Sequence, residues 1–165
     1  VEPNRWGRAN SAPFWSIRHF TYFLAQDSFF RLMAGFMGAV SGTALANPIL
    51  RRFGCSIGKR SLIGLPLQMS DWHAVDIGDD CVINGQMQLH SFENRVLTVR
   101  RTKIGNRSVI NHGAMLMGGA TLQSDVTVES QSLVLKAMQL SSGHHAGCPT
   151  QAVTDVTAAA TPSGR

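Results

Sequence analysis

Residues 104–140 read IGNRSVINHGAMLMGGATLQSDVTVESQSLVLKAMQL, and an aliphatic residue returns in this stretch at every sixth position. These positions are Ile104, Ile110, Leu116, Leu122, Val128, Val134 and Leu140. Four residues after each of the first six comes a mostly small residue: Ser108, Ala114, Ala120, Val126, Ser132 and Met138. A period of six matches neither the 3.6 residues per turn of a helix nor the alternation of a single strand. It is typical of hexapeptide solenoids, whose short parallel strands wind round a triangular prism, and it predicts an all-β fold.

The same period starts earlier in the chain and is interrupted twice. Its earlier members are Ile57, Ile63, Ile77, Ile83 and Leu89. The first interruption adds two residues between Ile63 and Ile77 and predicts a small corner loop near residues 70–73. The second adds three residues after Leu89 and predicts a longer loop at residues 90–103. Because the walls of such a prism are uniform, the longer loop is where we expect the chemistry to lie.

The predicted solenoid spans residues 53–142 and is flanked by two regions of different composition. Residues 1–52 combine a linker with a broad apolar stripe at helical spacing, which predicts an N-terminal helical segment. Residues 14–50 are expected to cover the open end of the solenoid or to lie at a membrane surface. Residues 32–50 carry no charge, but their glycines and proline argue against crossing a bilayer. Residues 143–165 are expected to form an exit turn and a flexible tail.

The composition argues against several functional classes. The chain has 165 residues, a net charge of +5 and only three cysteines, none of them in a CxxC pair, so we expect neither a metal site nor a disulfide framework. The GxSxG, Walker and HExxH motifs are absent, and no basic stretch is interleaved with aromatics as a nucleic-acid surface requires. The chain begins at Val1 without a secretory signal, so we expect a cytoplasmic fragment of a longer protein, with membrane association left open.

His90 is the candidate catalytic residue because it opens the longer loop. It follows an inward-facing leucine, so its imidazole is predicted to point outward and to take a proton from a hydroxyl or amine that attacks an acyl thioester. Glu93 could orient the imidazole, and Arg95 could hold an anionic group; alternatively, these two residues form an ion pair that closes the loop. A basic cluster in and after the loop could attract phosphate groups or be solvated surface: Arg95, Arg100, Arg101, Lys103 and Arg107. The other histidines are weaker candidates: His19, His73, His112, His144 and His145.

The repeat, with an outward histidine opening a loop, resembles the left-handed parallel β-helix acyltransferases of the hexapeptide-repeat group. That resemblance implies a general-base histidine on the loop. It also implies an acyl-CoA donor lying between neighbouring prisms of a trimer.

A narrower resemblance covers about residues 42–152. It is carried in order by GTALANPILRRFGCSIGKRSLIG, HAVDIGDDCVING, QLHSFENRV, SLVLKAMQLSSG and GCPTQ. These strings are similar to the C-terminal tandem domains of nonribosomal peptide synthetases of the poly-ε-lysine synthetase type. The resemblance implies aminoacyl donors held as carrier-protein phosphopantetheine thioesters and an intramolecular pseudo-trimer. Carried over by motif, the site would comprise His90 and Glu93 as catalytic residues, with Phe92 and Arg95 binding substrate.

The sequence departs from that pattern at three places. Leu89 stands where a threonine is expected before the histidine, Asn94 where an aspartate commonly follows the glutamate, and Cys148-Pro149 where relatives tend to read Asn-Pro. The leading hypothesis is acyl or aminoacyl transfer from a phosphopantetheine thioester to an amine or hydroxyl. A free-standing CoA-dependent acetyltransferase and a non-catalytic module of a trimeric or pseudo-trimeric assembly stay open as alternatives.

Overall fold

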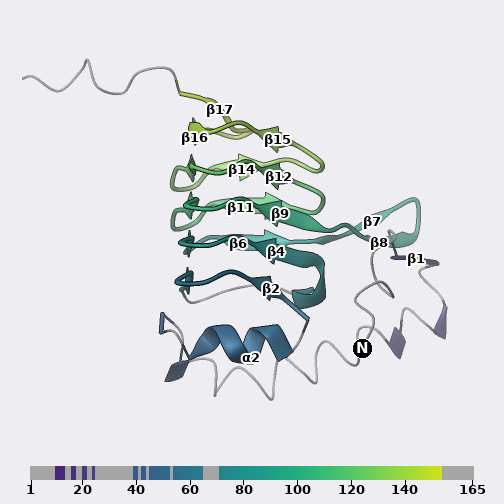
Figure 1. The fold of residues 1–165 in the computed structure, drawn as a ribbon. Coiled ribbons are helices and arrows are strands. Elements are labelled where there is room, and N and C mark those ends of the chain that lie inside the picture. The colour runs from purple at the N-terminus through teal and green to yellow at the C-terminus, as the bar shows by residue number, and fades with distance from the viewer. Residues whose placement is uncertain are drawn as a thin grey trace, which may run out of the picture.

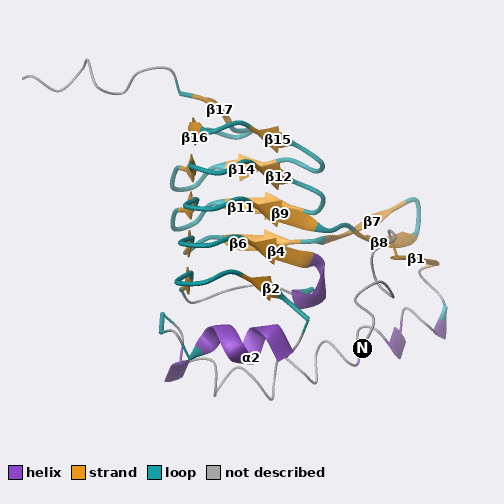
Figure 2. Ribbon diagram, in the orientation of Figure 1, coloured by secondary structure: helices purple, strands orange, loops and turns teal. Residues whose placement is uncertain are grey.

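The structure, a computed structural model, describes most of the chain from Ala46 onward and isolated positions before it. The described residues are 10–13, 16–17, 20–21, 24, 39–40, 42–43, 45–52, 54–64 and 71–153. Most of the predicted N-terminal apolar segment and the predicted tail therefore lie outside the described residues. The described part is mostly β with one α-helix, and its strands are stacked in coils (Figures 1 and 2).

Three parallel sheets form the walls of the prism. The first sheet contains β2 (Ser56–Ile57), β4 (Val75–Ile77), β9 (Thr102–Ile104), β12 (Thr121–Leu122) and β15 (Gln139–Leu140). The second contains β3 (Leu62–Ile63), β5 (Val82–Ile83), β10 (Val109–Ile110), β13 (Val126–Val128) and β16 (Gly143–Ala146). The third contains β6 (Gln86–Gln88), β11 (Met115–Met117) and β14 (Leu133–Val134). The chain visits the sheets in turn, which confirms the predicted coil; its left-handed sense stays a prediction.

Each coil places its side chains directly over those of the coil before. Ile104 pairs with Leu122, eighteen residues later, and Leu122 pairs with Leu140. All seven predicted aliphatic positions are 3% exposed or less, and Ser108, Ala114, Ala120, Val126 and Ser132 are buried with them. The predicted repeat is therefore the core of the protein, and stacked aliphatic columns supply its hydrophobic stabilisation.

Serine is tolerated at the small inward position because the backbone of the next coil satisfies its hydroxyl. Ser61 Oγ donates to the Gly78 carbonyl at 2.7 Å and accepts from the Cys81 amide at 3.1 Å. Ser108 Oγ donates to the Gln123 carbonyl at 3.2 Å. These bonds link successive coils and avoid the cost of a buried polar group without a partner.

The register corrects one member of the predicted repeat. Met87, not Leu89, pairs with Leu116 in the third sheet, so the aliphatic position comes four residues after Ile83 instead of six. The shortened turn passes through Gly85, where an added Cβ would lie 2.6 Å from Ile110 Cγ2. Glycine is what allows the backbone to take this shorter path.

The predicted loop at 90–103 is largely a β-hairpin that projects from the prism (Figure 1). Strands β7 (His90–Glu93) and β8 (Val96–Val99) pair antiparallel and are joined at Asn94 and Arg95, with φ of 50° and 62°. Positive φ at both residues is the requirement of a type I′ turn, whose twist suits a hairpin. Strand β1 (Asn10–Pro13) adds to the free edge of β8 and makes a three-stranded sheet.

Both ends of the coil are covered within the described residues. Helix α2 (Ala46–Arg52) lies below the first coil (Figure 2), where Asn47 Nδ2 donates to the Ser61 carbonyl at 2.7 Å and Arg51 Nε to the Ile57 carbonyl at 2.9 Å. At the other end β17 (Gln151–Ala152) pairs antiparallel with β16. Parallel pairing thus continues beyond residue 142, and the predicted domain boundaries stay a prediction. No helix of the described residues is long and apolar enough to cross a membrane.

Candidate functional site

Both interruptions of the repeat lie at one corner of the prism, here called the site corner. It comprises the segments that lead into strands of the first sheet: residues 71–74, 89–101, 118–120 and 135–138. The segment 71–74 precedes β4, the hairpin precedes β9, and these two strands are paired neighbours. The two irregular segments are therefore stacked on successive coils, which brings their side chains together.

The central contact of the site joins His90 to Asp71. Nδ1 of His90 lies 2.9 Å from Oδ2 of Asp71, and the side chains are 17% and 0% exposed. A carboxylate only accepts, so Nδ1 donates and the neutral ring carries its lone pair on Nε2. This arrangement fixes the orientation and tautomer of an imidazole that could act as a general base.

Glu93 does not contact His90, because the two residues lie on opposite sides of β7. Side chains alternate along a strand, so residues three apart point to opposite faces. Glu93 instead pairs with Lys136 from the next coil but one, and this contact lowers the pKa of the Glu93 carboxyl. The residue that holds the His90 imidazole is Asp71, which was not predicted from the sequence.

Phe92 shares the face of β7 that carries His90. Its ring centre lies 5.6 Å from that of His90 in an edge-to-face arrangement, and Phe92 is 46% exposed. Across the hairpin, the buried Leu97 and Val99 pair with these two residues and so lie on the same face. His90 therefore stands at the border between an apolar hairpin face and the buried carboxylate of Asp71.

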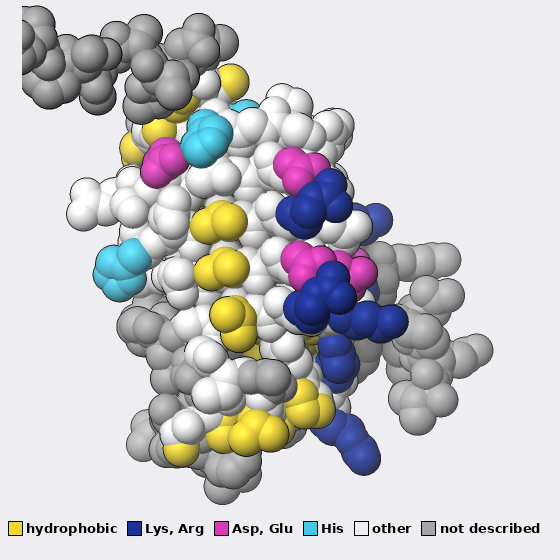
Figure 3. Space-filling view, turned by 60° about the vertical axis from the view of Figure 1, so that its left-hand side comes forward, with side chains coloured by type: hydrophobic (Ala, Val, Ile, Leu, Met, Phe, Trp, Pro, Cys, Tyr) yellow, Lys and Arg dark blue, Asp and Glu magenta, His cyan; other side chains and the backbone are white. Residues whose placement is uncertain are grey.

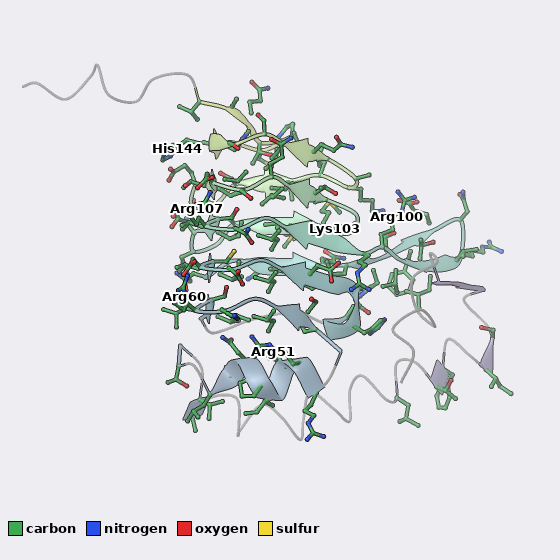
Figure 4. All side chains as sticks on the ribbon, in the orientation of Figure 1. Arg51, Arg60, Arg100, Lys103, Arg107 and His144 are labelled. Carbon is green, nitrogen blue, oxygen red and sulfur yellow. The ribbon has the colours of Figure 1, made fainter. Side chains whose placement is uncertain are left out.

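Arg95 lies in the exposed turn of the hairpin, and no ion pair links it to Glu93 among the described residues. The rest of the predicted basic cluster is divided between two edges of the prism. Arg101 pairs with Asp76, and Arg107 binds Asp125 through two nitrogens at 2.6 Å. Figure 4 shows Arg100 beside the hairpin, with Arg107 at another edge. The cluster is not one continuous surface.

The other described histidines lie in different surroundings. Burial lowers the pKa of His73, a shift that the charge of Asp71 opposes. His145 occupies an inward position of β16 and bonds through Nε2 to the Ser141 carbonyl at 2.7 Å, while His144 faces outward to Glu129 at 3.2 Å. No group of three or more histidine, cysteine, aspartate or glutamate side chains within residues 71–153 or the earlier described positions could hold a metal ion.

The signal for Asp71 was present in the length of the repeat. The first interruption precedes Ile77 and the second precedes Ile104, two positions of the same wall if every coil has three hexapeptides. Stacking the two irregular segments would have placed residues 70–73 beside His90. Asp71 is the acidic residue in that range.

The sequence matches no protein-family profile and no curated protein. Solved structures share its fold. A hexapeptide-repeat acetyltransferase from Vibrio cholerae has a TM-score of 0.63 at 14% identity, over 81% of this chain and 92% of that one. A maltose O-acetyltransferase from Clostridium difficile has a TM-score of 0.65 at 15% identity, over 93% and 96%. A galactoside acetyltransferase in complex with coenzyme A has a TM-score of 0.62 at 12% identity, over 90% and 87%.

These three structures are acetyltransferases, and the identity to each is low. They support the broader resemblance at the level of fold. The narrower resemblance to nonribosomal peptide synthetase domains stays a prediction. The chain therefore has the fold of the hexapeptide-repeat acetyltransferases.

Proposed function

We propose that this protein is an acyltransferase that moves an acyl group from a CoA thioester to a hydroxyl or amine. The observation that carries the proposal is the contact between His90 on the hairpin and the fully buried Asp71. Support comes from the fold, since a galactoside acetyltransferase of this fold was solved with coenzyme A and the Vibrio cholerae acetyltransferase was also solved with acetyl-CoA. CoA is accordingly preferred over a carrier protein as the donor.

In the proposed reaction His90 acts as the general base. Nε2 accepts the proton of the acceptor hydroxyl or amine as its oxygen or nitrogen attacks the thioester carbonyl. The carbon–sulfur bond then breaks, the acyl group stays on the acceptor, and the thiolate of CoA takes up the proton. The charge of Asp71 stabilises the imidazolium that forms in between, as a buried carboxylate does in other general-base pairs.

The remaining predicted site residues have different places in this proposal. Phe92 would line the site beside His90 and contact an apolar part of the substrate. Arg95, at the tip of the hairpin, stays a candidate for an anionic group of a substrate. Glu93 is engaged by Lys136 and takes no part in proton transfer. Assembly into a trimer is proposed only by resemblance.

The experiment is a thiol-release assay with acetyl-CoA and a panel of amine and hydroxyl acceptors. We expect His90→Gln to lower turnover by about 10²–10⁴-fold, the usual contribution of a general base. His112→Gln is the matched control, because His112 lies exposed in the turn between β10 and β11. Unchanged turnover in His90→Gln would contradict the assignment.

The same assay separates the alternative donors and the non-catalytic alternative. The acyl group is offered once on CoA and once on a carrier protein. Faster transfer from the carrier would favour the synthetase-type reading. No transfer from either donor to any acceptor would favour a structural module of a larger assembly.

A further inference from the structure

Leu89, Gly118 and Lys136 occupy one column of the site corner on three successive coils. Met87 pairs with Leu116, and Leu116 pairs with Val134. Each of the three column residues follows its paired strand residue by two positions. The column therefore presents a hairpin root, a glycine and a lysine in order along the prism.

Gly118 gives the hairpin root the space it needs. A Cβ at position 118 would lie 2.3 Å from the carbonyl oxygen and 3.0 Å from the carbonyl carbon of Leu89. Gly118 is not among the residues with positive φ, so its backbone conformation does not require glycine and only the contact does. The Gly118 amide also donates to the Gln88 carbonyl at 2.9 Å. Since Leu89 directly precedes His90, any displacement here moves the imidazole.

Lys136 holds strand β7 from the next coil but one. Its side chain, 26% exposed, extends to the carboxylate of Glu93, which is 53% exposed. Glu93 and His90 point to opposite faces of β7. Strand β7 is thereby held from one side by Asp71 through His90, and from the other by Lys136 through Glu93.

We infer that Gly118 and Lys136 are positioning residues of the site: the first seats the root of the hairpin and the second fixes its strand, so that together they set where the imidazole of His90 stands relative to a bound substrate. The inference rests on the proposed role of His90. Neither residue needs to touch the substrate. A misplacement of about 1 Å can cost up to about 10²-fold in rate, so a steric contact at this position has consequences for turnover.

The first test compares Gly118→Ala with Gly105→Ala in the full chain. An added Cβ at Gly105 would lie 2.5 Å from the Gln123 carbonyl carbon, a clash of similar severity on another edge of the prism. We expect a similar loss of melting temperature in both variants. Only Gly118→Ala should lose about 10- to 100-fold in kcat, with the KM of the donor unchanged, and should shift the imidazole NMR signals of His90. Equal kcat in both folded variants would overturn the inference.

The second test keeps the inference falsifiable if Gly118→Ala does not fold. Lys136→Gln removes the contact with Glu93, and Arg107→Gln removes a comparable ion pair far from the hairpin. Because exposed ion pairs are weak, we expect kcat to fall only about threefold, and only in Lys136→Gln. Exchanging the two charges in the double variant Glu93→Lys with Lys136→Glu should restore kcat. Failure of the exchange to restore kcat would count against the role of Lys136. An active His90→Gln variant would instead remove the proposed function, so the two failures are distinguishable.

Discussion

Two corners of the same prism are built differently. At one, here called the charged corner, the segments at residues 58–61, 78–81, 105–108 and 123–126 occupy the same place in successive six-residue steps and stack in register. Each has one residue of positive φ, and these residues form alternating charges: Arg60, Asp80, Arg107 and Asp125, at 56°, 57°, 55° and 61°. Arg60 pairs with Asp80 and Arg107 with Asp125, and Figure 3 shows acidic and basic side chains next to one another along one edge. At the site corner, the segment before β9 at residues 89–101 is much longer than those on the two coils above it, each of which takes six residues from one aliphatic position to the next.

The charged corner holds the coils in register, whereas the site corner carries the candidate catalytic residues. At the charged corner, hydrogen bonds repeat between coils: the Lys59 amide donates to Asp79 Oδ1 at 2.6 Å, and the Asp79 amide to Asn106 Oδ1 at 2.9 Å. Such bonds hold neighbouring coils in register. Once the register is fixed at one corner, another corner can lengthen its turns without displacing the walls. The hairpin and the segment with Asp71 use that freedom.

The largest effect is expected from Asp71→Asn, with the same substitution at Asp80 as its control. Asp71→Asn places an NH₂ group opposite Nδ1 of His90, which favours the wrong tautomer, so we expect turnover to fall by about 10²–10⁴-fold. Asp80→Asn makes the same change at the charged corner and should leave turnover unchanged. Steady-state kinetics of both variants, after circular dichroism shows that they are folded, checks the contrast. Similar turnover in the two would remove the distinction between the corners.

Truncating a side chain in the core that both corners share should lower the free energy of unfolding and leave turnover per folded molecule unchanged. Ile110 is fully buried in the aliphatic column of the second sheet. Ile110→Ala should cost about 2–5 kcal/mol of unfolding free energy, because it leaves a cavity in a close-packed column. Urea denaturation measures the loss, and Val109→Ala on the outward face of the same strand is the control. If Ile110→Ala lowered turnover per folded molecule as strongly as Asp71→Asn, the site would depend on the whole column.

The smallest effect is expected from removing an ion pair at the charged corner. The Arg107 guanidinium hydrogen-bonds Asp125 and holds the pKa of that carboxyl below its usual range. A carboxyl group whose pKa is lower in the folded than in the unfolded chain stabilises the fold at pH values above its unfolded-state pKa. That stabilisation is lost as the pH falls through the folded-state pKa. The melting temperature of the native protein should therefore slightly exceed that of Arg107→Gln at pH 7, and this difference should shrink below about pH 4.

Salt gives an independent check on the same pair. Both side chains are more than half exposed, and the Debye length falls to about 3 Å at 1 M salt. The difference between the native protein and Arg107→Gln should therefore shrink in 1 M NaCl. A difference that grows with acid or salt would show that the pair is not the source of the stabilisation.

The regular part of the fold was readable from the sequence, whereas the site was readable only in part. The positions of most strands follow from aliphatic residues such as Ile104 and Leu122, because a local period is enough to specify stacking. The prediction failed at Leu89, since a turn shortened by Gly85 shifts the period without leaving a gap in apolar character. Periodicity does not reveal the shorter turn here, because Met87 and Leu89 are both apolar and both buried.

His90 was located because it begins the longer interruption, but its partner was not. Glu93 is near His90 in sequence, and Asp71 is nineteen residues away. The predicted loop after His90 forms a hairpin strand, and in a strand residues three apart, such as His90 and Glu93, point to opposite faces. Contacts between coils depend on how two irregular segments stack, which a one-dimensional pattern encodes only through their lengths.

The coverage of both ends of the prism has a consequence for how this chain could change in size. Open strand edges invite pairing with other chains; helix α2 lies below the first coil, and strand β17 pairs with the edge of β16 in the last one. Additional coils are therefore accommodated most readily in the middle of the stack, where every coil has a similar coil on both sides. Duplicating the eighteen-residue turn at residues 123–140 would increase the height of the molecule and leave its terminal caps, Gly118, Lys136 and His90 in place.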